Sequence, residues 1–262
     1  MEGSVRRSVF LSLLLALLTF VAAPAAHADD DLSGRYAISG QEDSGAAYEG
    51  ELAIQRHGSA YDVSWQRPGV SGATESGLGL TLNHVLAVAY WPDGERPERG
   101  IGTVIYQIDG GTLNGLWLPE GAYNQKPGRE VLSGSPDLTG RFLITLGINP
   151  GGRSKYTGYV DLERSGDRFT VVWHAPRQVF LGNGIKIGNV LAVAYATRSP
   201  AIAAYCWNSR QMEGSWWTGP DGRSGKETLK PKGAGGELST VPQLNSQFNP
   251  RDPCNSPVAA NF

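Results

Sequence analysis

Residues that bind metals, and the apolar spacing of helices, are scarce in this chain. Among its 262 residues are two cysteines, two methionines and four histidines. After residue 28, no stretch keeps the 3.6-residue apolar spacing of an amphipathic helix for three turns. Alternating apolar residues dominate instead, with 35 glycines and 16 prolines supplying turn signals. These absences exclude a helical bundle and favour an all-β fold.

An excess of positive charge is also missing. The chain carries 23 Lys and Arg against 25 Asp and Glu, and no run of five basic residues occurs. Proteins that bind nucleic acid through its phosphates need a cationic surface, because they displace counterions. We therefore expect no nucleic-acid partner.

The first 28 residues have the three parts of a secretory signal peptide. Arg6 and Arg7 precede an apolar run over 9–21, and Ala26-His27-Ala28 offers a cleavage site. The alternative is a membrane anchor, but this run is shorter than the ~20 residues that span a bilayer. We expect cleavage after residue 28, a net charge of −3 for the remainder, and an exported protein, periplasmic or secreted, with no stable membrane span.

Cysteine usage agrees with export. Cys206 and Cys254 are the only pair, and an even count in an exported protein predicts a disulfide. Such a bond would tie the C-terminal tail to the last third of the chain. Two free thiols are the alternative.

The hexapeptide VLAVAY occurs twice, at 85–90 and at 190–195. A period of about 100 residues exceeds a solenoid unit and matches a small domain. We therefore predict two homologous domains, 31–135 and 136–232, after a signal peptide at 1–28 and before an irregular tail at 233–262. Further matched pairs include Tyr48/Tyr156, Tyr61/Phe169, Val63/Val171, Trp65/Trp173, Gly77/Gly182, Tyr106/Tyr205, Gly115/Gly214, Trp117/Trp216, Gly128/Gly225, Glu130/Glu227 and Leu132/Leu229.

Within one repeat the alternation predicts about eight short strands. Tight turns join them, so neighbours should pair antiparallel. Closing such a meander into an up-and-down barrel removes its exposed edges. In the first repeat the predicted strands are 34–40, 47–56, 60–66, 77–82, 85–91, 101–108, 112–118 and 129–133.

The VLAVAY strand is apolar on both faces, unlike the half-polar strand at 60–66. A strand buried on both sides needs a partner beyond its own core. We hypothesise that the two copies lie at a pseudo-symmetric interface between the domains. The alternative is that a loop or the C-terminal tail covers the outer face.

Two resemblances bear on this interpretation. The segments Leu32-Ser33-Gly34-Arg35-Tyr36 and Leu138-Thr139-Gly140-Arg141-Phe142 resemble the first strand of avidin-like and lipocalin-like barrels, although Tyr36 and Phe142 replace the usual Trp. This resemblance implies a calycin-like barrel and transfers no ligand site. The segments 147–152, 156–160 and 166–173 resemble exported bacterial tandem-repeat β proteins, some of them labelled fibronectin-binding, which implies an envelope or secreted location.

Motifs for catalysis and for cofactors are few. His57, His84 and His174 form no HxH or HExxH spacing, and no G-x-S-x-G elbow occurs. The segment GPDGRSGKET at 219–228 lacks the first glycine of a phosphate loop. We predict no cofactor, no metal and no catalytic residue. If one copy had become a hydrolase using Asp or Glu, His174, which replaces Gln66, is where we would look.

Tryptophans are the remaining candidates for ligand binding. Trp65, Trp117, Trp173 and Trp216 recur in both copies, as core residues or as the lining of a cavity. Three other tryptophans occur in one copy only, namely Trp91, Trp207 and Trp217. Because the fold does not require them in both copies, they are candidates for a surface contact.

Three functions follow from these patterns. The first is an exported, non-enzymatic binding protein that presents two barrels to a macromolecular partner, such as a host matrix or envelope component. The second is a carrier of a small hydrophobic ligand inside one barrel. The third is the hydrolase.

Overall fold

The computed structural model describes most of the chain after the predicted leader: residues 31–67, 74–92, 100–176, 178–208, 210–233 and 254. The signal peptide predicted at 1–28 lies outside the described residues. So does the tail predicted at 233–262, except for Gly233 and Cys254. Both assignments stay predictions.

Within the described ranges the protein consists of sixteen strands and one short 3-10 turn, η1 (Pro150–Gly152). The strand bounds match the predicted ranges of the first repeat to within three residues. Strands β1 to β8 are Gly34–Glu42, Ala47–His57, Ala60–Gln66, Thr74–Leu82, Val85–Pro92, Gly102–Asp109, Thr112–Pro119 and Gly128–Ser133. Strands β9 to β16 are Gly140–Ile148, Tyr159–Ser165, Arg168–Ala175, Gln178–Ile187, Val190–Ala196, Ala201–Trp207, Met212–Trp217 and Ser224–Pro231.

All strand pairings are antiparallel, and the strands form two closed barrels of eight strands each. The predicted fold class is therefore confirmed. One barrel has the order β1-β16-β15-β14-β5-β4-β3-β2, and we call it the first barrel. The other has the order β10-β11-β12-β13-β6-β7-β8-β9, and we call it the second barrel.

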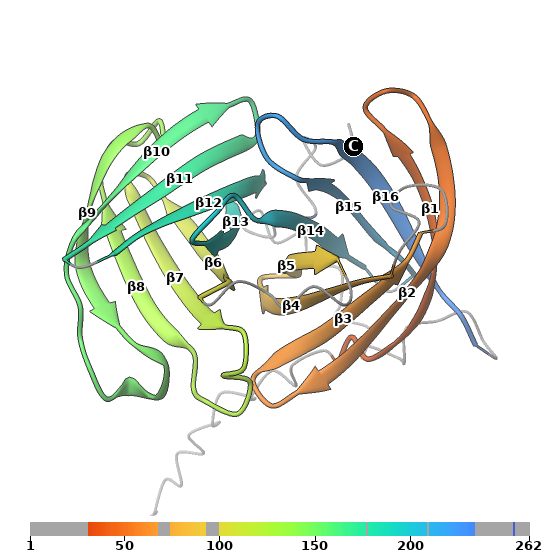
Figure 1. Cartoon of the computed structure of the whole chain (residues 1–262), viewed down its shortest axis with the longest axis horizontal. Helices are drawn as coiled ribbons and strands as arrows, with labels where there is room; N and C mark the ends of the chain where they lie inside the picture. The colour runs from red at the N-terminus through yellow and green to blue at the C-terminus, as the bar shows by residue number, and fades with distance from the viewer. Residues whose placement is uncertain are drawn as a thin grey trace, which may run out of the picture. The chain divides into compact units, whose positions relative to one another are not determined.

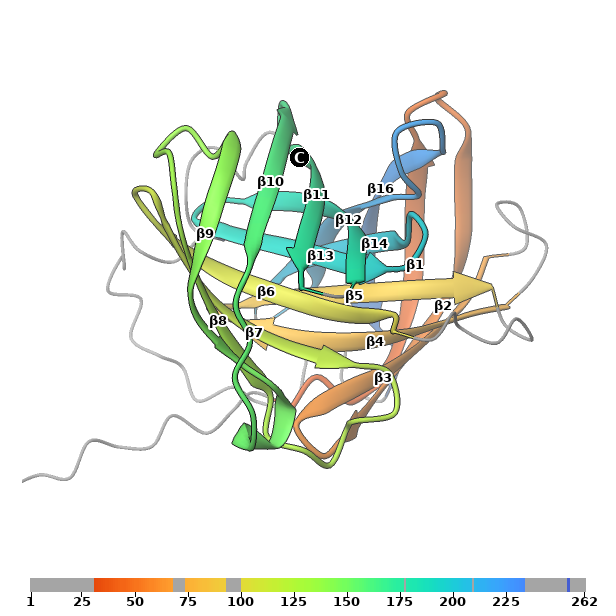
Figure 2. The same cartoon turned by 60° about the vertical axis from the view of Figure 1, so that its left-hand side comes forward.

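The two repeats exchange their last three strands. The first barrel takes β14–β16 from the second repeat, so that blue β16 lies beside red-orange β1 (Figure 1). The second barrel takes β6–β8 from the first repeat, and β6 pairs with β13 (Figure 2). The expectation of one barrel in 31–135 and another in 136–232 is thus corrected. Exchanged strands carry equivalent residues, so the sequence pattern is the same with or without exchange.

The exchange is symmetric in its register. In the first barrel Ala87 of β5 pairs with Ala204 of β14. In the second barrel the equivalent residue, Ala192 of β13, pairs with Ile105 of β6. Equivalent strands therefore meet at equivalent positions, as expected for a pseudo-twofold relation between the barrels.

Three apolar cores result from this arrangement. Each barrel has an interior core, and a third core, which we call the shared layer, combines outward-facing residues of both barrels. In VLAVAY the residues alternate between the barrel interior and the shared layer, and β5 packs on β13. The shared layer includes Leu78, Leu80, Val85, Ala87, Ala89, Ile105, Ile185, Ile187, Val190, Ala192, Ala194, Ile202, Ala204 and Trp217. The hypothesis of an interface at the two VLAVAY strands is confirmed.

One buried polar side chain in the shared layer forms hydrogen bonds between the two barrels. Thr103 of β6 is fully buried, and its hydroxyl donates to the Leu78 carbonyl oxygen at 2.6 Å. The Oγ1 atom of Thr103 in turn accepts from the Ala89 amide at 3.1 Å. A side chain of the second barrel thereby binds the backbone of the first, which sets the position of one sheet on the other.

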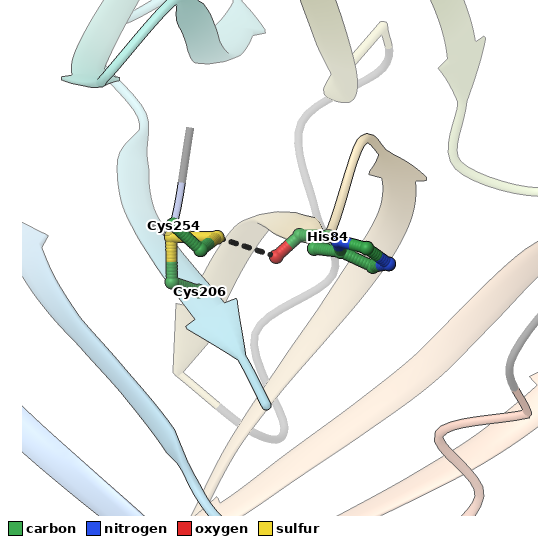
Figure 3. Close-up of a disulfide and its surroundings, with 3 residues drawn as sticks. All are labelled: His84, Cys206 and Cys254. Atoms are coloured by element: carbon green, nitrogen blue, oxygen red, sulfur yellow. Dashed lines mark hydrogen bonds between the residues drawn. A yellow bond between two sulfur atoms is a disulfide. The ribbon is translucent and has the colours of Figure 1, made fainter. Parts of the chain in front are cut away.

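The predicted disulfide between Cys206 and Cys254 is present, at the end of β14 (Figure 3). The Cys254 Sγ atom lies 3.1 Å from the carbonyl oxygen of His84, in the turn between β4 and β5. Both cysteines pack against the shared layer. The bond therefore holds Cys254 against β14 and the shared layer.

We also searched the described residues for a helix that could span a membrane. Among them, no helix has the length and apolar character needed to cross a bilayer.

The shared layer should be intolerant of charge. The double variant Ala87→Lys and Ala192→Lys places two ammonium groups where both residues have no exposed surface. We expect a loss in the free energy of unfolding of about 3 kcal/mol or more, because unpaired charges are costly to bury. Urea denaturation measures this loss. The control is Ala47→Lys at an exposed strand position, and equal stability of both variants would contradict the interface.

Candidate ligand-binding site

Each barrel contains one glutamate at the same position of its closing strand. Glu130 of β8 and Glu227 of β16 are each 3% exposed. Gly128 and Leu132 flank Glu130 at intervals of two, so all three residues face the interior. Burying a carboxylate is costly unless hydrogen bonds or a counter-charge compensate it. The two barrels compensate theirs differently.

In the first barrel, Glu227 has both hydrogen bonds and a counter-charge. The hydroxyls of Tyr48 and Tyr205 each donate to it at 2.8 Å. The Nη1 atom of Arg67 donates to its Oε1 atom at 2.6 Å. The guanidinium is 1% exposed, so this is a fully desolvated ion pair.

Arg67 also fills the end of the first barrel. Its Nε atom donates to Glu75 Oε2 at 2.9 Å. Its guanidinium carbon lies 5.7, 5.5 and 5.2 Å from the ring centroids of Trp65, Tyr90 and Trp216. These distances are within the range of cation–π attraction. One cation thus joins two carboxylates and three rings.

In the second barrel, Glu130 has hydrogen bonds from neutral groups. Tyr156 donates to Oε1 at 2.8 Å, and Trp173 Nε1 donates to Oε2 at 3.1 Å. The Tyr106 hydroxyl also donates to Oε2. No ion pair to Glu130 occurs among the described residues. Burial raises the pKa of the Glu130 carboxyl above its usual value, although the three donors partly offset this.

The equivalents of Arg67 and Glu75 in the second barrel are Ala175 and Phe180. Strand register shows the match directly, because Trp65 pairs with Glu75 as Trp173 pairs with Phe180. The second barrel therefore lacks the charged plug. In its place is a cavity of about 270 Å³.

Aromatic rings surround this cavity, and Glu130 forms part of its wall. Edge-on contacts hold the rings in place: the centroids of Trp117 and Tyr195 are 6.1 Å apart, and those of Phe180 and Tyr195 are 5.7 Å apart. The Tyr195 hydroxyl is buried and has no hydrogen-bond partner in the described part of the chain. The rings in the lining are Trp117, Tyr156, Trp173, Phe180 and Tyr195.

Two of the four repeated tryptophans line this cavity, whereas the sequence offered the whole set either as core residues or as a cavity lining. Trp117 comes from the first repeat and Trp173 from the second, and strand exchange brings them together. Trp65 and Trp216 are buried in the first barrel, where Arg67 occupies the space beside them. The repeated set therefore divides into one open site and one filled site.

The unrepeated tryptophans do not form the expected surface. Trp207 is 8% exposed in the interior of the first barrel, and Trp217 is 6% exposed in the shared layer. The surface-contact hypothesis is wrong for both, because Trp207 faces the interior of the first barrel and Trp217 is covered within the shared layer. Trp91 is half-buried against the shared layer. The neighbours Trp216 and Trp217 do point to opposite faces, as predicted.

The histidines lie outside the cavity. His174 follows Trp173 on β11 and so points to the opposite, outer face, where its Nε2 lies 3.1 Å from Asp161. His57 pairs with Asp62 at 3.0 Å and stacks on Tyr123. Within the ranges that the structure covers, no three His, Cys, Asp or Glu residues gather as a metal site would require. The cavity therefore offers one carboxylate, hydroxyls and aromatic faces.

Sequence reasoning missed Glu130, Glu227 and Arg67. A signal for the glutamates was available, since both copies keep a Glu between an inward-facing Gly and an inward-facing Leu. A charge repeated on an apolar face indicates a paired or functional group. Arg67 carries no such signal, because Ala175 replaces it in the other copy.

Comparisons of the chain with protein-family models, with curated proteins and with solved structures gave no match.

The ion pair should be essential to the first barrel. Arg67→Met leaves Glu75 and Glu227 buried without a cation, and we expect a loss of about 3 to 5 kcal/mol in unfolding free energy. The control is Arg168→Met, which removes an exposed pair with Asp43 and should cost about 1 kcal/mol or less. Adding Glu75→Gln and Glu227→Gln to Arg67→Met should restore most of the stability. Equal losses for the two arginine variants would contradict the role given to Arg67.

Proposed function

We propose that this protein is an exported small-molecule-binding protein and that the cavity of the second barrel is its binding site. The observation that carries the proposal is the contrast between equivalent barrel ends. Arg67 and Glu75 fill one end, whereas Ala175 and Phe180 leave about 270 Å³ open in the other. Export is supported by the leader pattern at 1–28 and by the disulfide.

The size of the cavity restricts its ligand. Sites for drug-sized ligands enclose roughly 300 to 1,000 Å³, so 270 Å³ suits a compact molecule. Mostly aromatic walls with a few converging polar groups are typical of such sites. A carrier of a large, flexible lipid is disfavoured, and a small ring or a short chain with one polar head fits best.

The first barrel then has a structural role. It supplies half of the shared layer, which supports β6, β12 and β13 of the second barrel from outside. Its own interior is occupied by the Arg67 ion pairs. A rigid support keeps the rings of a binding site in position, which reduces the entropy lost on binding.

The other two hypotheses have less support. The hypothesis of a macromolecular partner relied on exposed Trp91, Trp207 and Trp217, and the last two are buried. A hydrolase would have used His174, which faces away from the cavity. The small-molecule site is the function that the geometry supports best.

The proposal can be tested on protein purified from its native host. Native mass spectrometry should show a bound small molecule at a ratio of one per chain, since the proposed site is the single cavity of the second barrel. Ala175→Trp fills the cavity and should remove this adduct. Ala47→Trp, at an exposed strand position, is the matched control and should retain it. An adduct that survives Ala175→Trp would place the site elsewhere.

A further inference from the structure

We propose that the ligand of the second barrel is an organic cation, with a guanidinium or ammonium head that takes the place Arg67 occupies in the first barrel. This inference rests on the proposed function and adds the chemical class of the ligand. It follows from a comparison of the two barrels. Arg67 pairs with Glu227 in the first barrel, whereas Ala175 has the equivalent position beside Glu130 in the second.

The first step is the position of the internal cation. Arg67 reaches Glu227 across the barrel end, and Glu227 is the equivalent of Glu130. In both barrels the glutamate also accepts a hydroxyl from each of two equivalent tyrosines, Tyr48 and Tyr205 in one, Tyr156 and Tyr106 in the other. The tyrosines therefore present the two carboxylates in the same way, and the third donor differs: it is the Arg67 guanidinium for Glu227 and the Trp173 indole for Glu130.

The second step is the set of rings around the cation. Arg67 lies near Trp65, Tyr90 and Trp216. Their equivalents, Trp173, Tyr195 and Trp117, all line the cavity. Aromatic faces attract cations most strongly where water is excluded. The second barrel thus keeps the three aromatic rings, and Ala175 replaces the arginine that they surround in the first barrel.

The third step is charge. Glu130 is 3% exposed, and the groups that face it from β6, the β9–β10 connection, β11 and β13 are Tyr106, Tyr156, Trp173 and Tyr195. All of these are neutral. In the part of the chain that the structure describes, no cation pairs with Glu130. A desolvated carboxylate of this kind favours a cation over a neutral or anionic ligand.

The fourth step is space. Ala175 has no side chain beyond Cβ where Arg67 has its three-carbon stem and guanidinium. Phe180 replaces Glu75, which removes the second carboxylate and adds an apolar wall. One anionic contact remains, so a ligand with a single positive charge and an apolar stem matches the site.

The test is a titration of the protein, first freed of bound ligand, with n-propylguanidinium, a copy of the Arg67 side chain. Neutral n-propylurea has nearly the same shape, and butyrate carries the opposite charge. Isothermal titration calorimetry and quenching of tryptophan fluorescence should show one site per chain. The guanidinium should bind roughly tenfold or more tighter than the urea, because charge-assisted hydrogen bonds are about twice as strong as neutral ones.

Two variants separate the charge from the cavity. Glu130→Gln keeps an acceptor for the tyrosine and tryptophan donors but removes the charge, and should abolish the preference for guanidinium over urea. The double variant Ala175→Arg and Phe180→Glu installs the plug of the first barrel, and should bind neither probe. Ala47→Lys, which adds an exposed charge, should leave both affinities unchanged.

The pH dependence gives a second readout that needs no variant. Burial raises the pKa of Glu130 in the empty barrel, and a cation selects the ionised carboxylate. Affinity for n-propylguanidinium should therefore fall as pH drops through this raised pKa and level off above it. Affinity for n-propylurea should show no such decline.

The outcomes distinguish the two proposals. Equal affinity for guanidinium and urea, or an unchanged preference in Glu130→Gln, would overturn the cation and leave the cavity as a binding site. Preferential binding of butyrate would also overturn the cation. If no probe binds and the protein from its host carries no small molecule, the proposed function itself fails.

Discussion

The structure depends on one feature, which is that neither repeat closes a barrel with its own strands alone. Each barrel completes its hydrogen-bonded circle with three strands from the other repeat. Exposed strand edges are thereby removed where the repeats pair, at β5–β14 and β1–β16 in the first barrel and at β13–β6 and β8–β9 in the second. The chain passes from the first barrel to the second after β5 and returns after β13, and the outer faces of these two strands meet in the shared layer. Small alanines at those positions let the two sheets approach closely.

Exchange also decides the composition of the candidate site. Glu130, Tyr106 and Trp117 come from the first repeat, whereas Tyr156 and Trp173 come from the second. A ligand in this cavity would therefore contact both halves of the duplication. Neither repeat contains the whole set of groups, so the site exists only when strands of both repeats have joined in the second barrel.

Duplication produced two equivalent interiors, and two substitutions separate their roles. Where Arg67 and Glu75 occur, opposite charges fill the barrel end and satisfy the buried Glu227. Where Ala175 and Phe180 occur, the end contains the cavity, and the donors to Glu130 among the described residues are neutral. In the filled barrel, removing one partner of the ion pairs would be costly, because it leaves a buried charge uncompensated. In the other barrel the buried carboxylate is part of the cavity wall.

The sequence by itself determined the local order of the protein. Alternating apolar residues predicted the strands, and turn residues predicted their antiparallel pairing, because both depend on neighbours along the chain. The VLAVAY segments, which are apolar on both faces, predicted the interface. Cys206 and Cys254 could be paired because no other cysteine exists. Only the tertiary structure decided which strands close which barrel, because β6–β8 and β14–β16 carry interchangeable patterns. It also decided the fate of the tryptophans: Trp217 is buried by a sheet distant in sequence, and Trp117 meets Trp173 only through exchange. Burial and charge compensation are properties of residues brought together in space, and spacing along the chain does not encode them.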